Sequence, residues 1–282
     1  MEPRIIIHGG FFSESSDSAE VKKAKQETLR KIVTDAYQFL QQHSSLETVV
    51  YAVSLLEDCD LFNAGLGSQI QGDGKIRMSA SVMEGTTKNF SGVINIEEVK
   101  NPVCVAHRLL TFEDKVLSGP EAQDFARREG FEYFNPETKK RKEEYVKKLH
   151  DSMRKGTVGC VALDSRGNLA AATSTGGKGF ELPGRVSDSA TVAGNYANRC
   201  AAVSCTGVGE DIVNAALASS VVTRVTDGLS LEDACLRSMQ ELKDHNGFAG
   251  LICISANGEI WHGDSHPFMV WASHDGTARV FS

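Results

Sequence analysis

The junction at residue 156 constrains this chain more than any other feature of its sequence. A charged segment over residues 135–155 ends where the sequence becomes apolar, in the run Thr157-Val-Gly-Cys-Val-Ala-Leu163. The residues after Thr157 predict a buried strand, and the threonine stands directly in front of it. A β-branched residue is also common at the start of an ordinary strand, so the junction alone leaves two interpretations open.

The second interpretation is chemical. Cleavage of the Gly156–Thr157 bond would give Thr157 a free α-amine beside its own hydroxyl. An alcohol is a weak nucleophile at its ordinary pKa, and an adjacent amine can act as its general base. An α-amino group titrates at about pH 7.7–8.0, close to the pH at which acid–base catalysis is most efficient. This interpretation predicts a self-processing hydrolase whose nucleophile is the new terminal threonine.

Composition excludes several other classes. The 282 residues, 41% hydrophobic and 24% charged, suffice for one large core or two small ones. A net charge of −7 argues against nucleic acid as the main partner. The seven cysteines contain no C-x-x-C pair and are interpreted as reduced residues of a cytoplasmic protein. No apolar run approaches the ~20 residues that span a membrane, and no signal-peptide pattern opens the sequence.

Hydrophobic periodicity and turn residues divide the chain into helices and strands. Strands are expected at residues 5–8, 75–82, 89–96, 158–163, 169–174, 201–206, 249–255, 259–263 and 268–272. Helices are expected at residues 19–42, 46–58, 102–110, 121–128 and 230–244, with one more opened by Gly209. Central strands with helices on either side predict a layered α/β sandwich. The charged segment is interpreted as a solvated helix or a disordered connector rather than a nucleic-acid patch.

Small polar residues and glycines are placed where they could converge on Thr157. Thr175 ends a strand expected to run antiparallel to the strand behind Thr157, so its hydroxyl lies at the right level. Arg185 and Asp188 could clamp the carboxylate and ammonium of an amino acid, although a surface salt bridge is the alternative. The run Thr206-Gly-Val-Gly209 at a strand-to-helix junction could offer N–H groups to an oxyanion, although glycines are common there.

Metal and cofactor motifs are weak by comparison. His262 and His266 stand four residues apart, but Gly263 and Pro267 argue against a helix, so loop histidines are favoured over zinc ligands. The sequence contains neither a P-loop nor a Gly-x-Ser-x-Gly nucleophile elbow.

Eight segments together resemble the plant-type L-asparaginases, which are also isoaspartyl peptidases, of the N-terminal-nucleophile hydrolase superfamily. They follow the family's order over nearly the whole chain: His8-Gly-Gly10, Phe62-Asn-Ala-Gly65, Met78-Ser-Ala-Ser-Val-Met-Glu-Gly85, Asn101-Pro102, Gly156-Thr-Val-Gly159, Thr173-Ser-Thr-Gly-Gly177, Gly184-Arg-Val-Ser-Asp188 and Thr206-Gly-Val-Gly-Glu210. Any one of these segments is weak evidence, but eight in order are strongly specific.

The resemblance implies an α/β fold, the four-layer αββα sandwich of this superfamily. It implies a single domain, residues 1–282, that cleaves itself into residues 1–156, with a mobile linker at about 135–156, and residues 157–282. The processed units would form a homodimer that hydrolyses L-asparagine to aspartate and ammonia and cleaves β-aspartyl dipeptides. No cofactor or metal is expected in catalysis, but a structural sodium ion is implied near residues 56–62. No nucleic-acid or membrane partner is expected.

The resemblance also implies roles for the catalytic residues. Thr157 would be the nucleophile in both self-cleavage and hydrolysis, and Thr175 would position it and support the charge changes there. Asn63 would stabilise the oxyanion and hold the substrate side-chain carbonyl together with Thr206 and Gly207.

A second set of implied roles concerns the substrate and the cleavage site. Arg185 would bind the substrate α-carboxylate and Asp188 its α-ammonium, beside the glycine-rich turn that ends at Gly209. Gly9 and Gly10 would shape the strand next to the scissile bond that follows Gly156.

Several positions depart from the family pattern. Phe11 and Phe12 stand where small residues are usual, Ser79 replaces an aspartate, and Ser187 replaces a glycine. Two alternatives therefore stay open beside the asparaginase. One is a related N-terminal-nucleophile amidase or endopeptidase with another acyl substrate, and the other is a scaffold that never processes.

Overall fold

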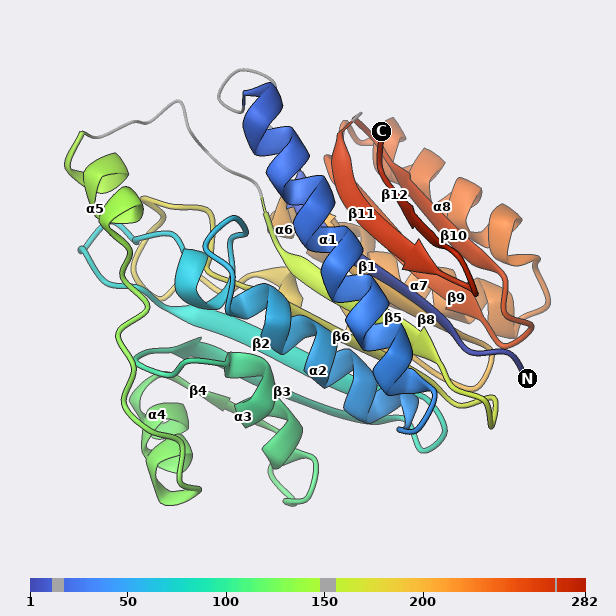
Figure 1. The fold of residues 1–282 in the computed structure, drawn as a ribbon, viewed down its shortest axis with the longest axis horizontal. Helices are drawn as coiled ribbons and strands as arrows, with labels where there is room; N and C mark the ends of the chain where they lie inside the picture. Colours follow the sequence, from blue (N-terminus) through green and yellow to red (C-terminus); the bar gives the residue numbers. More distant parts are fainter. Residues whose placement is uncertain (12–17, 148–155, 267) are drawn as a thin grey trace.

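The computed structural model describes residues 1–11, 18–147, 156–266 and 268–282, which form two β-sheets with helices (Figure 1). In spatial order, the larger sheet consists of β12 (Ala278–Val280), β11 (Met269–His274), β1 (Arg4–Phe11), β5 (Val158–Leu163), β6 (Leu169–Thr175), β2 (Met78–Glu84), β3 (Asn89–Ile96) and β4 (Val116–Ser118). The smaller sheet consists of β10 (Ile260–Asp264), β9 (Ala249–Ser255), β8 (Ala201–Gly207) and β7 (Asn195–Ala197). All the described pairings are antiparallel except that of β3 with β4.

Helices pack against both sheets. They are α1 (Ala19–Leu40), α2 (Ser45–Glu57), α3 (Pro102–Leu109), α4 (Gly119–Arg128), α5 (Lys139–Val146), α6 (Gly209–Ala215), α7 (Leu217–Thr226) and α8 (Leu231–Asp244). One apolar cluster joins α1, α2 and α3 to the larger sheet, a second joins the two sheets, and a third joins the smaller sheet to α7 and α8. In Figure 1, α1 and α2 cross the near face of the larger sheet. Of the helices in the described ranges, none is both long and apolar enough to cross a membrane.

Strand β5 shows how this packing positions the junction. All six of its residues are buried, because helices cover one face of the strand and the smaller sheet covers the other. Val158 and Cys160 belong to the helix-side cluster, whereas Val161 lies in the cluster between the sheets. Because side chains alternate along a strand, Thr157 falls on the face that points towards the smaller sheet.

The helices and strands expected from the sequence are confirmed, with small shifts of their boundaries. The strand expected at 75–82, for example, begins at Met78 and continues to Glu84. Within the described ranges, four strands and α-helices were not predicted from the sequence: β4, β7, β12 and α7. The start of α7 is hard to recognise because Ala216, in the left-handed conformation, joins it directly to α6.

Part of the charged segment forms a helix. Helix α5 occupies its centre and begins with a cap, in which the Thr138 side chain accepts a hydrogen bond from the backbone N–H of Arg141. The Arg141 side chain is buried, and its Nε donates to the Gly67 carbonyl at 2.8 Å. The prediction of a helix is therefore confirmed for residues 139–146. The helix is not fully solvated, because the Arg141 side chain is buried against the rest of the protein. Residues 148–155 of the expected linker lie outside the described part of the chain.

Candidate active site

Thr157 lies directly before β5 and is 5% exposed. Its Oγ1 donates to Thr175 Oγ1 at 3.3 Å, since the two residues stand at adjoining ends of the antiparallel pair β5 and β6. The Thr175 hydroxyl in turn donates to the Gly156 carbonyl at 3.3 Å and accepts from the Gly177 N–H at 3.2 Å. The structure thus brings together the two threonines that the sequence placed at one level.

The carbonyl of Gly156, which belongs to the bond expected to break, receives two donors. Asn63 Nδ2 donates to it at 2.7 Å, and Thr175 Oγ1 is the second donor. Asn63 Oδ1 accepts from the Gln69 N–H at 3.1 Å, which fixes the orientation of the amide. Donors aimed at a carbonyl oxygen stabilise the negative charge that develops there when the carbon is attacked.

The two glycines at the end of β1 have different neighbours. Gly10 has φ +86°, and a Cβ at this position would lie 2.7 Å from Gly156 Cα. A Cβ on Gly9 would instead lie 2.5 Å from Cε1 of Phe62, the residue before Asn63. Gly10 therefore packs directly on the peptide bond that is expected to break. Gly9 instead leaves room for the ring of Phe62, which precedes the donor Asn63 in the sequence.

Gly10→Ala is expected to block or strongly slow self-cleavage, because its methyl group would displace Gly156 from the donors of its carbonyl. Gly130→Ala is the matched control, since Gly130 has φ +84° but no described atom lies within 4 Å of the place that its Cβ would take. Both variants carry the left-handed strain of about 1–2 kcal/mol. Intact mass followed over days measures the effect, and processing of Gly10→Ala at the control's rate would contradict it.

Arg185 is paired with a carboxylate, but not with the one expected. Its Nε and Nη2 donate to the two carboxylate oxygens of Glu210, each at 2.9 Å, and Lys178 Nζ reaches the same carboxylate at 3.2 Å. This two-pronged geometry is the one by which a guanidinium holds a carboxylate. The sequence does not single out Glu210 as this partner, because an acid in the first turn of a helix is common wherever it interacts favourably with the helix dipole.

Asp188 lies beside this pair, in the interior. Burial raises the pKa of its carboxyl from 3.8 to about 7, and the nearby charge of Arg185 opposes that rise. Its Oδ2 has no hydrogen-bond partner within the described residues. Gly209 makes the arrangement possible, because a Cβ there would lie 2.7 Å from Arg185 Nη2 and 2.9 Å from Asp188 Oδ1. This Asp188 oxygen could accept from an ammonium group, and Arg185 already holds a carboxylate, that of Glu210. An α-amino acid carries both of these charged groups.

Thr206 and Gly207 stand opposite the nucleophile at the end of β8. The Thr206 hydroxyl is fully buried and lacks a partner in the described ranges. Gly207 has φ +141°, and a side chain on it would collide with the Phe248 carbonyl. Gly207 lines one small cleft of about 140 Å³, together with Thr157, Thr175, Arg185, Asp188 and Gly209, whereas Thr206 is not among its lining residues.

A polar chain behind the nucleophile was not predicted. His8 Nε2 lies 2.9 Å from Ser204 Oγ, which lies 2.7 Å from Thr173 Oγ1, so the chain links both sheets. Burial lowers the pKa of His8 to about 3, and its imidazole is therefore neutral at ordinary pH. A side chain on Gly159 would collide with both His8 and Ser204. The sequence offers one signal of this polar chain, namely the histidine that follows the apolar run Ile5–Ile7 in β1.

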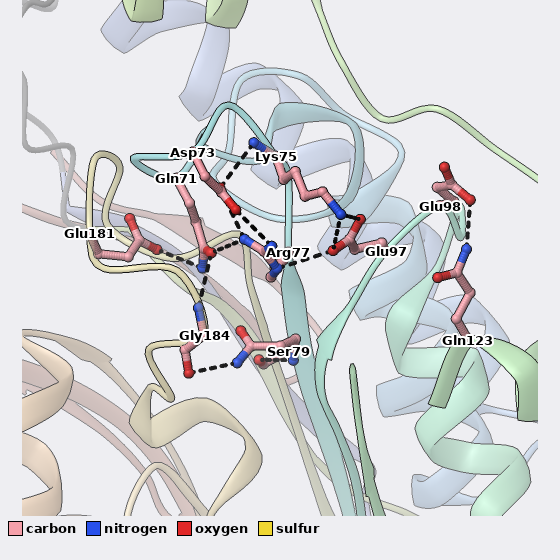
Figure 2. Close-up of polar contacts among 11 residues, drawn as sticks. Gln71, Asp73, Lys75, Arg77, Ser79, Glu97, Glu98, Gln123, Glu181 and Gly184 are labelled. Atoms are coloured by element: carbon pink, nitrogen blue, oxygen red, sulfur yellow. Dashed lines mark hydrogen bonds and ion pairs between the residues drawn. The ribbon is translucent and has the colours of Figure 1, made fainter. Parts of the chain in front are cut away.

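The loop before Arg185 is held by its own polar network (Figure 2). Gln71 Oε1 accepts from Arg77 Nη1 at 2.6 Å and from the Gly184 N–H at 3.4 Å. Asn95 Nδ2 donates to the Gly184 carbonyl at 3.0 Å, while the Asn95 N–H donates to Ser79 Oγ at 3.1 Å. Ser79, one of the departures from the family pattern, thus supports the loop that presents the guanidinium.

Ser187 and the pair Phe11 and Phe12 also depart from the family pattern. The Ser187 side chain accepts from the Ser189 N–H and caps the short turn that contains Asp188, so serine serves well there. Phe11 closes β1, and Phe12 lies outside the described residues.

Comparison with known proteins identifies the family. A family model described as Asparaginase matches residues 1–280. An isoaspartyl peptidase/L-asparaginase from Synechocystis sp. is 43% identical, over 99% of this chain and 89% of the relative. An isoaspartyl peptidase from Escherichia coli is 39% identical, over 91% and 88%, and a plant-type L-asparaginase from Pyrococcus abyssi is 34% identical, over 95% of each. The chain belongs to the asparaginase family of hydrolases, as its eight segments indicated.

Proposed function

We propose that this chain is a self-processing threonine amidohydrolase that hydrolyses L-asparagine to aspartate and ammonia and cleaves β-aspartyl dipeptides. One observation carries the proposal: Thr157 and the pair Arg185 and Asp188 line the same cleft. The names of the relatives point to the same two substrates.

The proposal includes the four-layer αββα sandwich, which the three apolar clusters between helices and sheets support. It also includes a cytoplasmic homodimer of processed units. The seven cysteines are free thiols, which fits a reducing compartment. The dimer rests on the family resemblance alone.

Self-cleavage would begin when Thr157 Oγ1 attacks the carbonyl carbon of Gly156. The charge that forms on the carbonyl oxygen faces Asn63 Nδ2 and Thr175 Oγ1. The C–N bond then breaks, the nitrogen takes up the proton that Oγ1 has given up and becomes the α-amine, and Gly156 remains as an ester on Oγ1. Water hydrolyses that ester and leaves a free carboxylate on Gly156.

Substrate hydrolysis would use the same hydroxyl. The substrate α-carboxylate would bind Arg185, in competition with Glu210, and the ammonium would bind Asp188. The α-amine of Thr157 accepts the hydroxyl proton as Oγ1 attacks the β-carbonyl carbon, and the proton passes to the departing amine as the C–N bond breaks. Thr206 and Gly207 would stabilise the oxyanion, as the family resemblance implies. Water then releases aspartate from the ester.

A structural sodium ion near residues 56–62 remains part of the proposal. The carbonyl oxygens of Asp60 and Phe62 both approach the position that a Cβ of Gly67 would take, and oxygen ligands of this kind suit a hard cation. Such an ion would brace the loop that carries Asn63. The proposed catalytic steps use only the groups of the chain, the substrate and water.

Turnover of a substrate panel by the processed protein tests the proposal. We expect release of ammonia from asparagine and of leucine from β-Asp-Leu. Turnover of glycosylasparagine alone would support the related amidase instead. A chain that processes but turns over none of the three would contradict the proposal, and a chain that never processes would support the scaffold.

A further inference from the structure

The order of the strands gives the cleft two ends. In the larger sheet β5 lies between β6 and β1, and in the smaller sheet β8 lies between β7 and β9. β6 packs against β7, and β1 packs against β9. Thr157, before β5, and Gly207, at the end of β8, therefore occupy the middle, with one pair of strands on each side.

The amino-acid clamp lies at the β6 and β7 end. The short turn Asp188–Ala190 contacts both of these strands. A Cβ on Gly194, the residue before β7, would lie 2.6 Å from the Asp188 carbonyl oxygen. A substrate whose α-groups bind there and whose β-carbonyl reaches Thr157 must extend its leaving group towards the opposite end.

Aromatic rings occupy that opposite end. Phe11 closes β1 directly after Gly10, and Phe248 stands immediately before β9. The centroids of their rings are 4.6 Å apart with the planes tilted by 56°, and Phe248 also stacks on His266 at 4.6 Å. Both phenylalanines are half-buried and His266 is exposed. We call Phe11, Phe248 and His266 the aromatic wall.

The aromatic wall is tied to the reacting centre at two points. The Phe248 carbonyl accepts from the Val208 N–H at 2.9 Å and packs on Gly207, opposite Thr157. Gly10, the neighbour of Phe11, packs on Gly156. The backbone at the aromatic wall therefore adjoins the residues around the bond that breaks, while its rings lie outside the lining of the small cleft itself.

We propose that the aromatic wall binds the side chain of the residue released from a β-aspartyl dipeptide, and that it selects large apolar or aromatic leaving residues. This inference rests on the proposed function, whose substrate class it narrows. Aromatic contacts and the burial of apolar surface supply the discrimination. Asparagine releases only ammonia, which is too small to reach the rings.

The test compares kcat/KM of the processed wild-type protein for β-Asp-Phe, β-Asp-Gly and asparagine. We expect β-Asp-Phe to exceed β-Asp-Gly by about tenfold, the effect of a modest apolar contact in a binding pocket. Equal values, or a preference for β-Asp-Gly, would overturn the inference without any variant. If the substrates are hydrolysed but the dipeptides show no such preference, only this inference fails. If the processed protein hydrolyses none of the three substrates, the proposed function fails.

Phe248→Ala is expected to bring the ratio of β-Asp-Phe to β-Asp-Gly close to one. His266→Ala removes an exposed ring and is expected to lower the same ratio, which keeps the test valid if Phe248→Ala does not fold. Tyr133→Ala is the control, because Tyr133 is an exposed aromatic residue that contacts Arg127 on another part of the surface. An unchanged ratio in a folded Phe248→Ala or His266→Ala protein would contradict the role of the wall.

Discussion

Thr157→Ala is expected to remain one chain of 30.5 kDa and to lose asparagine and β-aspartyl hydrolysis altogether. The variant removes the hydroxyl that donates to Thr175, and among the described residues only Thr175 itself offers another hydroxyl to the Gly156 carbonyl. Loss of a catalytic nucleophile lowers kcat by roughly 10⁴-fold or more. Intact mass, measured fresh and after several days at neutral pH, together with ammonia release, provides the measurement.

Thr157→Ser separates the chemical role from the structural one. It keeps the hydroxyl and, after cleavage, the α-amine, and is therefore expected to yield two fragments that meet at residues 156 and 157. The buried environment is the same for both variants, so a folding defect would affect them alike. Fragments at this junction in Thr157→Ala would show that another group performs the cleavage.

Local pattern predicted much of this molecule. The alternation in β5 and β6 brought Thr157 and Thr175 to one level, and the run from Thr206 to Gly209 marked a strand-to-helix junction whose last three residues line the cleft. Periodicity predicts elements well because it reports which face of an element is buried. The family segments then indicated a particular kind of α/β sandwich. They could do so because several contain glycines such as Gly10, which the fold requires where two backbones approach closely.

Contacts between distant segments were beyond such patterns. Glu210 pairs with Arg185 across 25 residues, and Ser204 meets His8 across 196 residues, so neither pairing has a local signature. Arg141 lies within a charged run typical of a solvated segment, yet it is buried: Glu144 pairs with it locally, and the carbonyl of the distant Gly67 accepts its Nε–H. A charged residue is buried only when its partner is present, and the partner is fixed by the tertiary fold.

Asp188→Asn is expected to lower kcat/KM for asparagine by about 10²–10³-fold, because an uncharged amide cannot hold the substrate ammonium in a buried site. The wild-type kcat/KM should rise as pH increases through about 7, where the Asp188 carboxyl becomes ionised. The Thr157 α-amine must also lose a proton in this region, at about pH 7.7–8.0. The variant should therefore keep only the part of the profile that the amine contributes. Identical profiles for both proteins would contradict the role of Asp188.

Stability distinguishes this loss of function from unfolding. A carboxyl pKa raised from 3.8 to about 7 means that the folded state holds the proton more tightly than the unfolded chain. Stability from Asp188 is thus fully present below pH 3.8 and is lost as pH rises to 7, by about 4 kcal/mol in all. At pH 8 the variant avoids a buried charge, and its Tm should be no lower than that of the wild type. Asp227→Asn, at an exposed carboxylate after α7, should change neither activity nor Tm. A buried carboxylate that costs stability at neutral pH fits a site for a cationic group, because the substrate ammonium would supply the partner that Asp188 Oδ2 lacks among the described residues.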